Sequence, residues 1–524
     1  MTGAPSAAAA PRAGRAGGRR HVWLVFLALS VCTQLPYVKA AVAPPPGRAF
    51  VGTFHWIDDY YNYLSFVRQA EEGRFLFDSA VYLQPHRPVL VNLEWWVVGR
   101  LSAALGGRPL VAYRLFGMLA TLALLLGVDR WLEGCGVPPG HRLPALVLAA
   151  VGGGLGGWLF ELTELPVSRS LDLASGMFPF FEALANPHFV AGTALFVWAL
   201  WLLVEASGPR GTAGGLLLGC VTSLVRPYDA VNLGAVRALG ILLTSPLRRV
   251  PGRLLPLAAL APPLAYDLWI FFTHPGFTYH SEMRYYFPPR VDFLAALGPA
   301  AGLALLSTAA SPAGDAVRRR RIHLACWAGL AAPIVLLSPR FFLSQHLTGV
   351  GLPLLMLGAI GLARFRPAAT WLAAVALSFT SVVAVRIVLR DEPVWQVPAE
   401  RLQAAEVLRS SCRHGDVFLG PPDVGLYAIG LSSCRGAVSY QWARGFAERL
   451  ARAREFYGSA DAAARTAWLE ELCVTHLALP GDAGPVPTAW LGVGTRFVRL
   501  ADLKGAHGEL SLYARERPAS CRTP

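Results

Sequence analysis

The chain has 524 residues, of which 54% are hydrophobic and only 15% charged, and its formal net charge is +14. Soluble domains carry about 25% charged residues, so this composition argues against a soluble protein and indicates a polytopic membrane protein. The positive charge does not indicate nucleic-acid binding, because the arginines cluster in short loops between apolar runs, which is the positive-inside pattern of membrane topology. Lysine occurs only at Lys39 and Lys504, and this bias, with abundant Ala, Gly and Pro, points to a GC-rich bacterial genome.

The first 21 residues are predicted to form a cytoplasmic tail. The apolar stretch after them is long and runs into Pro44-Pro45-Pro46, so it is interpreted as an uncleaved first helix rather than a signal peptide. Eleven apolar runs approach the 17–25 residues that a spanning helix needs. They are 22–43, 110–128, 143–161, 188–206, 213–227, 229–245, 254–272, 291–309, 322–338, 347–363 and 368–388.

The arginine-rich loops orient these helices. The N-terminus and the arginines at 248–253, 318–321 and 364–366 mark the inner side. Counting spans from them places the break at 226–229 and everything after residue 390 outside. Residues 89–106 carry Asn92, Glu94 and Arg100, so we expect an amphipathic helix along the outer surface rather than a span. The domain 22–389 then has a long first outer loop, 44–109.

Residues 390–524 change character, because charged residues become more frequent and apolar runs shorten. The pattern predicts helices at 399–411, 443–457 and 462–473 and strands at 416–419, 475–479, 495–500 and 509–514. We therefore expect a small extracytoplasmic α/β domain. Four cysteines fall in this region without the spacing of a metal site, which predicts disulfides in an oxidising compartment but leaves the pairing open. They are Cys412, Cys434, Cys473 and Cys521.

Two adjacent carboxylates, Asp58 and Asp59, lie at the start of the first outer loop. Acidic residues beside a bilayer are costly unless they function or face water. On a helix the two side chains would project about 100° apart, so we expect one in a site and one supporting it. The alternative is the acidic first turn of an interfacial helix.

Further polar residues fall at predicted outer edges. His86 and Arg87 lie between two prolines, where a stiff backbone suits either a phosphate clamp or a plain surface turn. Arg226 and Asp229 flank a helix break, which indicates a water-lined functional cavity or an intramolecular ion pair.

Arg340 and His346 flank two phenylalanines, and either phosphate binding or snorkelling to lipid headgroups explains them. His188, in Asn186-Pro187-His188, is compatible with a helix cap. Asp172 in the second outer loop competes with Glu161, Glu164 and Glu182 as a second acidic site residue.

The layout resembles the GT-C class of polytopic glycosyltransferases, such as protein mannosyltransferases and aminoarabinose transferases. The resemblance rests on Asp58-Asp59 through Tyr63-Leu64 and on Pro85-His86-Arg87-Pro88, supported by short motifs at 186–189, 226–229 and 339–342. It implies an α-helical polytopic fold of about eleven transmembrane helices with a C-terminal extracytoplasmic α/β domain, in the inner membrane.

The resemblance also implies chemistry. Displacing a phosphate from a sugar's anomeric carbon needs a carboxylate to activate the acceptor and cationic groups to hold the departing phosphate. Asp58 or Asp59 would be the base, and Asp58 a possible ligand of Mg or Mn. The donor would be a polyprenyl-phosphate-linked sugar and the acceptor a glycan, lipid or protein. His86, Arg87, Arg226 and Arg340 would help to bind phosphate.

Two other functions compete with this one. The chain lacks a Walker loop, GxGxxG, HExxH and GxSxG, which argues against an ATP-driven pump and the common hydrolases. A non-enzymatic transporter or flippase for lipid-linked glycans, or an envelope assembly protein, stays possible from the sequence.

Overall fold

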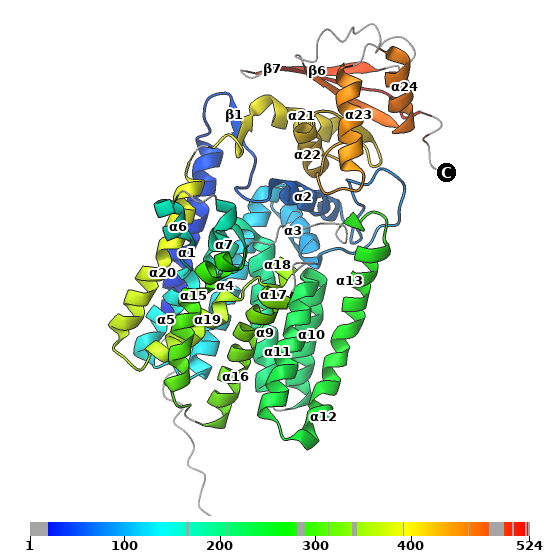
Figure 1. The fold of residues 1–524 in the computed structure, drawn as a ribbon. Helices are drawn as coiled ribbons and strands as arrows, with labels where there is room; N and C mark the ends of the chain where they lie inside the picture. The colour runs from blue at the N-terminus through cyan, green and yellow to red at the C-terminus, as the bar shows by residue number, and fades with distance from the viewer. Residues whose placement is uncertain are drawn as a thin grey trace, which may run out of the picture.

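The computed structural model describes residues 19–163, 167–206, 208–279, 289–312, 314–337, 343–390, 392–458, 461–480, 497–505, 508–518 and 521. A long helical bundle forms one body, and a small domain with a mixed sheet covers one of its ends (Figure 1). Side chains such as Leu24, Leu27 and Val31 of α1 are each more than half exposed on the bundle surface. An exposed apolar surface of this kind is expected where lipid covers a protein.

Within the described residues, six helical segments are long and apolar enough to cross a membrane, or seven if the bent pair α5 (Pro139–Val151) and α6 (Gly156–Thr163) is one span. The six are α1 (Arg20–Val42), α4 (Pro109–Gly134), α9 (Pro187–Glu205), α12 to α13 (Leu247–Thr273), α15 with η4 (Arg290–Ala309) and α20 (Pro367–Val388).

The expectation of eleven full spans is therefore corrected. Each of the remaining predicted runs is helical, but shorter or more charged than a span. Helices α10 (Pro209–Val225) and α11 (Pro227–Thr244) are separated at Arg226. Helix α16 (Asp315–Gly329) carries four arginines and is followed by the short α17 (Ala331–Leu337). Helix α19 (Gly351–Leu362) has 12 residues, all buried by protein rather than lipid.

Helices α2 (Ile57–Glu71) and α3 (Leu93–Ala104) lie between the bundle and the small domain (Figure 1). Helix α3 has 12 residues, about 18 Å of helix, which is too short to span. The two helices touch closely at Gly99, where a Cβ atom would lie 2.4 Å from the backbone oxygen of Val67. Strand β1 (Arg48–Phe50), just before α2, pairs antiparallel with β2 (Gln396–Pro398) and ties the first outer loop to the start of the small domain.

The small domain is the predicted α/β unit. Its five-stranded sheet has the order β4-β3-β5-β7-β6, with β3 parallel to β4 and β5 and the remaining pairs antiparallel. Its strands are β3 (Val417–Leu419), β4 (Arg435–Gly436), β5 (Val474–Pro480), β6 (Val498–Gly505) and β7 (Gly508–Ala514). Its helices are α21 (Ala399–Ser411), α22 (Pro422–Leu431), α23 (Phe446–Gly458) and α24 (Ala462–Glu471). The sequence did not predict α22, β2 or β4.

Two disulfides, as expected for this region, join Cys412 to Cys434 and Cys473 to Cys521, with Cα–Cα distances of 5.5 and 5.8 Å. Their presence suits an oxidising compartment.

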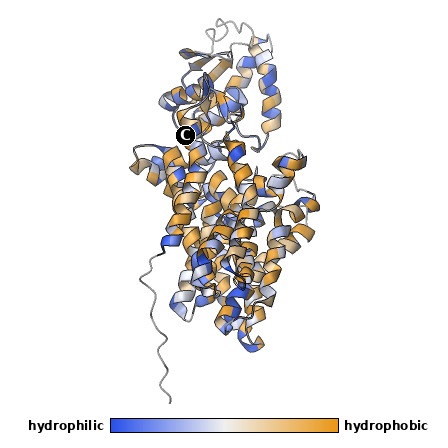
Figure 2. Ribbon diagram, turned by 90° about the vertical axis from the view of Figure 1, so that its left-hand side faces the viewer, coloured by the Kyte–Doolittle hydropathy of each residue, from blue (hydrophilic) through white to orange (hydrophobic). Residues whose placement is uncertain are grey.

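The two ends of the bundle differ in charge. At the end far from the small domain, Arg320 pairs with Glu205 and donates to the carbonyl of Gly134, while His21 lies 2.7 Å from Asp129. Helix α12, which begins after two further arginines, lies at this same end (Figure 1). Figure 2 shows hydrophobic colouring along the middle of the bundle and hydrophilic residues towards its two ends.

Candidate active site

The acidic pair lies in the first turn of α2, at the junction of the bundle and the small domain. Trp56 precedes the helix in a left-handed conformation (φ 46°), which turns the chain sharply into α2. Asp58 and Asp59 follow in the first turn, where the helix dipole favours negative charge.

The small domain contacts both carboxylates with two consecutive residues. The hydroxyl of Tyr440 donates to Asp59 Oδ1 at 2.7 Å, and the side chain of Gln441 hydrogen-bonds Asp58. Both residues lie in the loop between β4 and α23. Helix α22 supports this contact, because the rings of Tyr61 and Tyr427 lie 4.9 Å apart at the α2–α22 interface.

Burial changes the ionisation of the pair. It raises the pKa of Asp59 to about 6, although the hydrogen bond from Tyr440 lowers it, and the neighbouring Asp58 charge raises it further. Burial also raises the pKa of Asp58, while the hydrogen bond with Gln441 lowers it. Asp58 is the less deeply buried of the two. The carboxylates therefore differ in environment, as their separation on the helix predicts.

The segment from α8 (Pro179–Ala185) into α9 forms the floor beneath the start of α2. The ring of Trp56 lies 5.1 Å from that of Phe189, and the His55 ring lies 4.8 Å from that of Phe181. On α4, the hydroxyl of Tyr113 donates to Asn186 Oδ1 at 3.0 Å. Asn186 also caps α9 by accepting from the His188 backbone N–H, so the predicted cap is present.

Arg114, next to Tyr113 on α4, is a buried cation at this floor. Its guanidinium carbon lies 3.3 Å from the centroid of the Tyr37 ring, and Nη1 donates to the Leu184 carbonyl at 3.3 Å. Nε and Nη2 are buried with no hydrogen-bond partner in the described structure, and so is Nε2 of His55. Buried polar groups are normally satisfied, so these orphaned groups at the floor are candidates for binding a ligand.

His188 and Glu94 form a second polar contact at this floor, between His188 Nδ1 and a Glu94 carboxylate oxygen. Glu94 is buried on α3, and its burial raises its pKa well above the ordinary range. The adjacent Trp95 stacks on Tyr63, with ring centroids 4.5 Å apart. This stack joins the Glu94–His188 pair to α2.

The helix break at residue 226 holds an ion pair. Arg226 is 1% exposed, and its Nε lies 3.0 Å from Asp229 Oδ2. Its Nη2 donates to Thr348 Oγ1 at 2.9 Å, and its guanidinium lies 4.6 Å from the Phe189 ring centroid. Arg226 thus lies on Phe189, whose ring also contacts Trp56.

Two other predicted site residues, His346 and Asp172, have structural contacts. Next to this break, His346 Nδ1 contacts Asn232 Oδ1 at 3.0 Å. Asp172 accepts from the backbone N–H groups of Gly154 and Gly156, at 2.9 Å each, and so stabilises the α5–α6 bend. Arg340 lies outside the described residues.

His86 and Arg87 lie away from the acidic pair. Nε2 of His86 accepts from the Ser79 backbone N–H at 2.9 Å, and Nδ1 lies 3.0 Å from the Gln84 carbonyl. Asp78, next to Ser79, hydrogen-bonds Gln69, which lies about 16 Å along α2 from the pair. Arg87 is exposed, and its carbonyl accepts from His274 at 2.8 Å.

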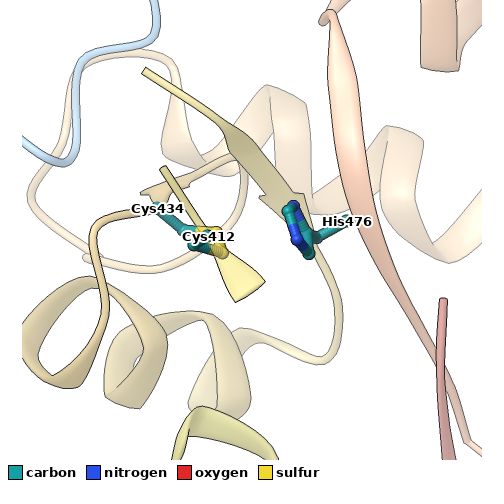
Figure 3. Close-up of side chains that lie close together, drawn as sticks. All are labelled: Cys412, Cys434 and His476. Carbon is teal, nitrogen blue, oxygen red and sulfur yellow. A yellow bond between two sulfur atoms is a disulfide. The ribbon is translucent and has the colours of Figure 1, made fainter. Parts of the chain in front are cut away.

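The possible metal ligands of the described residues do not gather at the acidic pair. Among the described residues, the one cluster of three potential ligands is Cys412, Cys434 and His476. Figure 3 shows the two sulfur atoms joined in the disulfide with the imidazole beside it, so the thiolates that would bind a metal are absent. Asp58 belongs to no such cluster in the part of the chain that the structure describes.

Three solved membrane proteins share this fold. The arabinofuranosyltransferase AftD from Mycobacteria matches with a TM-score of 0.53 at 17% identity over 95% of this chain. The oligosaccharyltransferase AglB from Archaeoglobus fulgidus, solved with an inhibitory peptide and a dolichol-phosphate, gives 0.53 at 10% identity over 88% of this chain. ArnT from Cupriavidus metallidurans, solved with undecaprenyl phosphate, gives 0.53 at 12% identity over 96%.

The lengths of these proteins differ. The match spans 40% of AftD, 70% of AglB and 99% of ArnT. No protein-family model matches the chain, and no curated protein sequence matches it. The chain therefore has a GT-C-like fold, structurally similar to GT-C membrane glycosyltransferases over most of its length.

Four residues of this site were not predicted as functional from sequence. Tyr440 and Gln441 lie about 380 residues from the acidic pair, and no local pattern links the two segments. Arg114 follows the start of an apolar span, where an arginine is typical of an interface anchor. Glu94 was noted only as a polar position of an amphipathic helix.

Proposed function

We propose that this protein is a membrane glycosyltransferase that moves a sugar from a polyprenyl-phosphate-linked donor to an acceptor on the outer face of a bacterial inner membrane. The fold supports this proposal, since GT-C enzymes of this architecture use such donors and ArnT was solved with undecaprenyl phosphate. The arginine-rich end of the bundle, opposite the acidic pair, supports the orientation.

The observation that carries the proposal is the placement of an acidic pair and an orphaned cation around one aromatic floor. Asp58 and Asp59 lie at the start of α2, and Arg114 lies on α4. Helices α2 and α4 are in contact through the neighbours of these residues. The ring of Tyr60, next to Asp59, lies 5.2 Å from that of Tyr113, next to Arg114. A transfer from a sugar phosphate needs this pairing of a base with an anion-holding group.

In the proposed reaction, an acceptor oxygen attacks the anomeric carbon of the donor sugar. Asp58, the less buried carboxylate, takes the acceptor's proton as the new C–O bond forms. The bond between the anomeric carbon and the phosphate oxygen breaks, and the lipid phosphate leaves with the electron pair. Attack opposite the leaving group inverts the anomeric centre.

Asp59 has a positioning role in this scheme. Tyr440 holds its carboxylate, and the neighbouring Asp58 charge raises the pKa of Asp59. Adjacent acids of this kind titrate as a coupled pair rather than independently.

Arg114 would bind the departing phosphate with its orphaned N–H groups. Arg226 would act through its charge from behind Phe189, because it is almost completely buried and already paired with Asp229. His188 would line the floor, and Arg340 would be a further phosphate ligand. His86 and Arg87 would shape the first outer loop, since His86 uses both ring nitrogens in contacts within the turn.

A divalent cation such as Mg or Mn, if bound, would neutralise phosphate charge. The described residues supply Asp58 but no cluster of three ligand side chains around it, so they do not by themselves form a cation site. We route no step of the reaction through a metal.

The test uses the full chain in lipid nanodiscs with a panel of polyprenyl-phosphate sugars. Release or transfer of the sugar is measured for wild type, Asp58→Asn and Asp59→Asn, with Asp502→Asn on the exposed surface of β6 as the matched control. We expect Asp58→Asn to reduce turnover by about 10²–10⁴-fold, the usual contribution of a general base. Asp502→Asn should have no effect. Turnover that survives in both α2 variants contradicts the proposal, and lipid movement without bond cleavage would favour a flippase.

A further inference from the structure

A cavity lies away from the acidic pair, between the small domain and the first outer loop. Its volume is about 920 Å³, within the roughly 300–1,000 Å³ of pockets that enclose small ligands. The first outer loop contributes residues 82–85, and the small domain contributes residues around 414–417, α23, and the end of α24 with the turn after it.

Positive charge dominates the wall of this cavity. Among the described residues, five arginines line it against two glutamates, Glu448 and Glu471. The arginines are Arg435, Arg444, Arg449, Arg452 and Arg517. They come from separate segments, so folding of the small domain brings them together.

Two of these arginines are held by neutral partners. Arg435 donates to the carbonyls of Leu83 and Gln84, at 3.0 and 3.3 Å. Arg449 donates to the carbonyls of Ala437 and Arg444, both at 2.7 Å. Backbone carbonyls orient a guanidinium but do not neutralise it, and burial lowers the pKa of both arginines. An anion in the cavity would therefore gain more from them than from arginines already in ion pairs.

Two of the other arginines, Arg452 and Arg517, are neutralised by ion pairs. Arg452 makes a bidentate pair with Glu471, at 2.8 and 2.7 Å, and Arg517 lies 3.0 Å from Asp416. These pairs fix the rim of the cavity. The remaining positive charge belongs to the wall near Arg435 and Arg449, on which the carboxylates of Asp78 and Glu448 act from nearby.

The cavity is connected to the proposed active site by one segment. Residues 437–449 run from the loop whose Tyr440 and Gln441 contact the acidic pair into α23, which carries Arg449 and Arg452. A molecule bound in the cavity would lie beside the loop that covers the carboxylates. This is the position expected for part of an extended acceptor rather than for the reacting atoms.

We propose that this arginine-lined cavity binds an acidic saccharide, a glycan segment bearing carboxylate or phosphate groups, as the distal part of the acceptor. The role of this saccharide as an acceptor rests on the proposed function, but its binding in the cavity does not. Arginine recognises carboxylates and phosphates through paired N–H donors. A concave wall suits a chain of sugars better than the flat surface of a bilayer.

The test measures equilibrium binding of trigalacturonate, a carboxylated trisaccharide, to the full chain in nanodiscs, with maltotriose as the neutral control. We expect trigalacturonate to bind, maltotriose not to bind, and the affinity for trigalacturonate to fall as salt rises. Arg435→Gln and Arg449→Gln should each weaken binding by fivefold or more. Arg499→Gln, on the exposed surface of β6, is the matched control and should leave it unchanged.

Arg449→Lys keeps the charge and should recover part of the affinity, which separates a loss of charge from a loosened loop. The proposal is overturned if neither sugar binds, if both bind equally, or if Arg499→Gln weakens binding as much as the cavity variants. It is also overturned if anionic vesicles, and not trigalacturonate, are bound through Arg435 and Arg449.

The same measurement on Asp58→Asn separates this inference from the proposed function. If wild type binds trigalacturonate but transfers no sugar, only the proposed glycosyltransferase activity is contradicted. Transfer without trigalacturonate binding would contradict only the acidic-saccharide site.

Discussion

The hydroxyl of Tyr440 donates a 2.7 Å hydrogen bond to Asp59, across a separation of 381 residues. It joins the small domain to the first turn of α2 at the acidic pair. The neighbouring Gln441 makes the equivalent contact with Asp58. The small domain is therefore part of the candidate active site, and its attachment through α22 and the β1–β2 pair fixes that contact.

Replacement of Tyr440 by Phe should shift the pH dependence of turnover. The hydrogen bond stabilises the charged form of Asp59, so its loss raises the pKa of Asp59 above about 6. Hydrogen bonds to charged groups contribute about 1.5–3 kcal/mol, and one pKa unit corresponds to about 1.4 kcal/mol. We expect the acidic limb of the kcat/KM profile to move upward by about one unit, with activity recovering at higher pH.

The matched control for this shift is Tyr457→Phe. Tyr457 donates to the Ala478 carbonyl within the small domain, so its hydroxyl has a similar structural role away from the acidic pair. Tyr457→Phe should leave the acidic limb in place. An unshifted limb in Tyr440→Phe would show that Tyr440 does not control the ionisation of the pair.

Arg114→Met should separate activity from stability. The variant removes two buried N–H groups without partners, each costing about 1–3 kcal/mol, and loses a cation–π contact worth about 1–2 kcal/mol. We expect an apparent melting temperature no lower than that of wild type, but donor turnover reduced at least tenfold. Arg114→Lys should retain more turnover, because it keeps the charge.

Arg130→Met, on the exposed surface of the same helix, is the control and should leave turnover unchanged. Thermal unfolding followed by tryptophan fluorescence and a donor-cleavage assay give the two readouts. Wild-type turnover in Arg114→Met would remove Arg114 from the phosphate site.

Local sequence patterns predict some features of this fold and not others. The predicted strands and helices of residues 399–514 are present because period-two and helical patterns depend on neighbouring residues. Helix α22 was missed, although Pro422 lies in its first turn, because its apolar residues also fit a buried strand. The number of spans was overestimated because apolar helices such as α19 are buried by protein, and composition does not distinguish protein from lipid.

The candidate site shows the same limit. Asp58 and Asp59 were recognisable because adjacent charges are unusual in an apolar chain. The contacts of Arg114 and Tyr440 depend on how distant helices pack, so no spacing in the sequence indicates them. The roles expected for His86 and Asp172 likewise depended on neighbours that the sequence does not specify, and the structure gives both residues backbone partners.

Glu94→Gln should leave stability nearly unchanged at about pH 4, where the carboxyl is mostly protonated in the unfolded chain as well, and should stabilise the protein relative to wild type as the pH rises. Burial raises the pKa of Glu94 well above the ordinary range, so the folded protein keeps this side chain neutral, and an amide replaces it closely. A raised folded pKa gives stability that is present below the unfolded pKa and is lost as pH rises towards the folded value. Glu94→Gln removes that loss, so its melting temperature should rise relative to wild type between about pH 5 and 8.

Glu94→Ala provides the contrast for this measurement. It leaves His188 without its carboxylate partner and opens a cavity, so we expect a loss of about 2–4 kcal/mol. Melting curves of the three proteins across this pH range test the prediction. Equal destabilisation by Gln and Ala would mean that Glu94 is charged in the folded protein.

The orientation of the bundle predicts which residues a membrane-impermeant reagent reaches. Leu247 is 84% exposed beside Arg248 and Arg249 at the arginine-rich end, and Trp442 is 39% exposed next to the loop that covers the acidic pair. Because arginine-rich loops stay in the cytoplasm, residue 442 should face the outside and residue 247 the cytoplasm.

A Trp442→Cys variant should therefore react with an impermeant maleimide on intact spheroplasts, and a Leu247→Cys variant should react only after permeabilisation. The background replaces the four free cysteines and keeps both disulfides, so each label reports one position. Labelling of residue 247 in intact cells would invert the bundle and place the acidic pair on the cytoplasmic face, where a donor facing the outer side could not reach it.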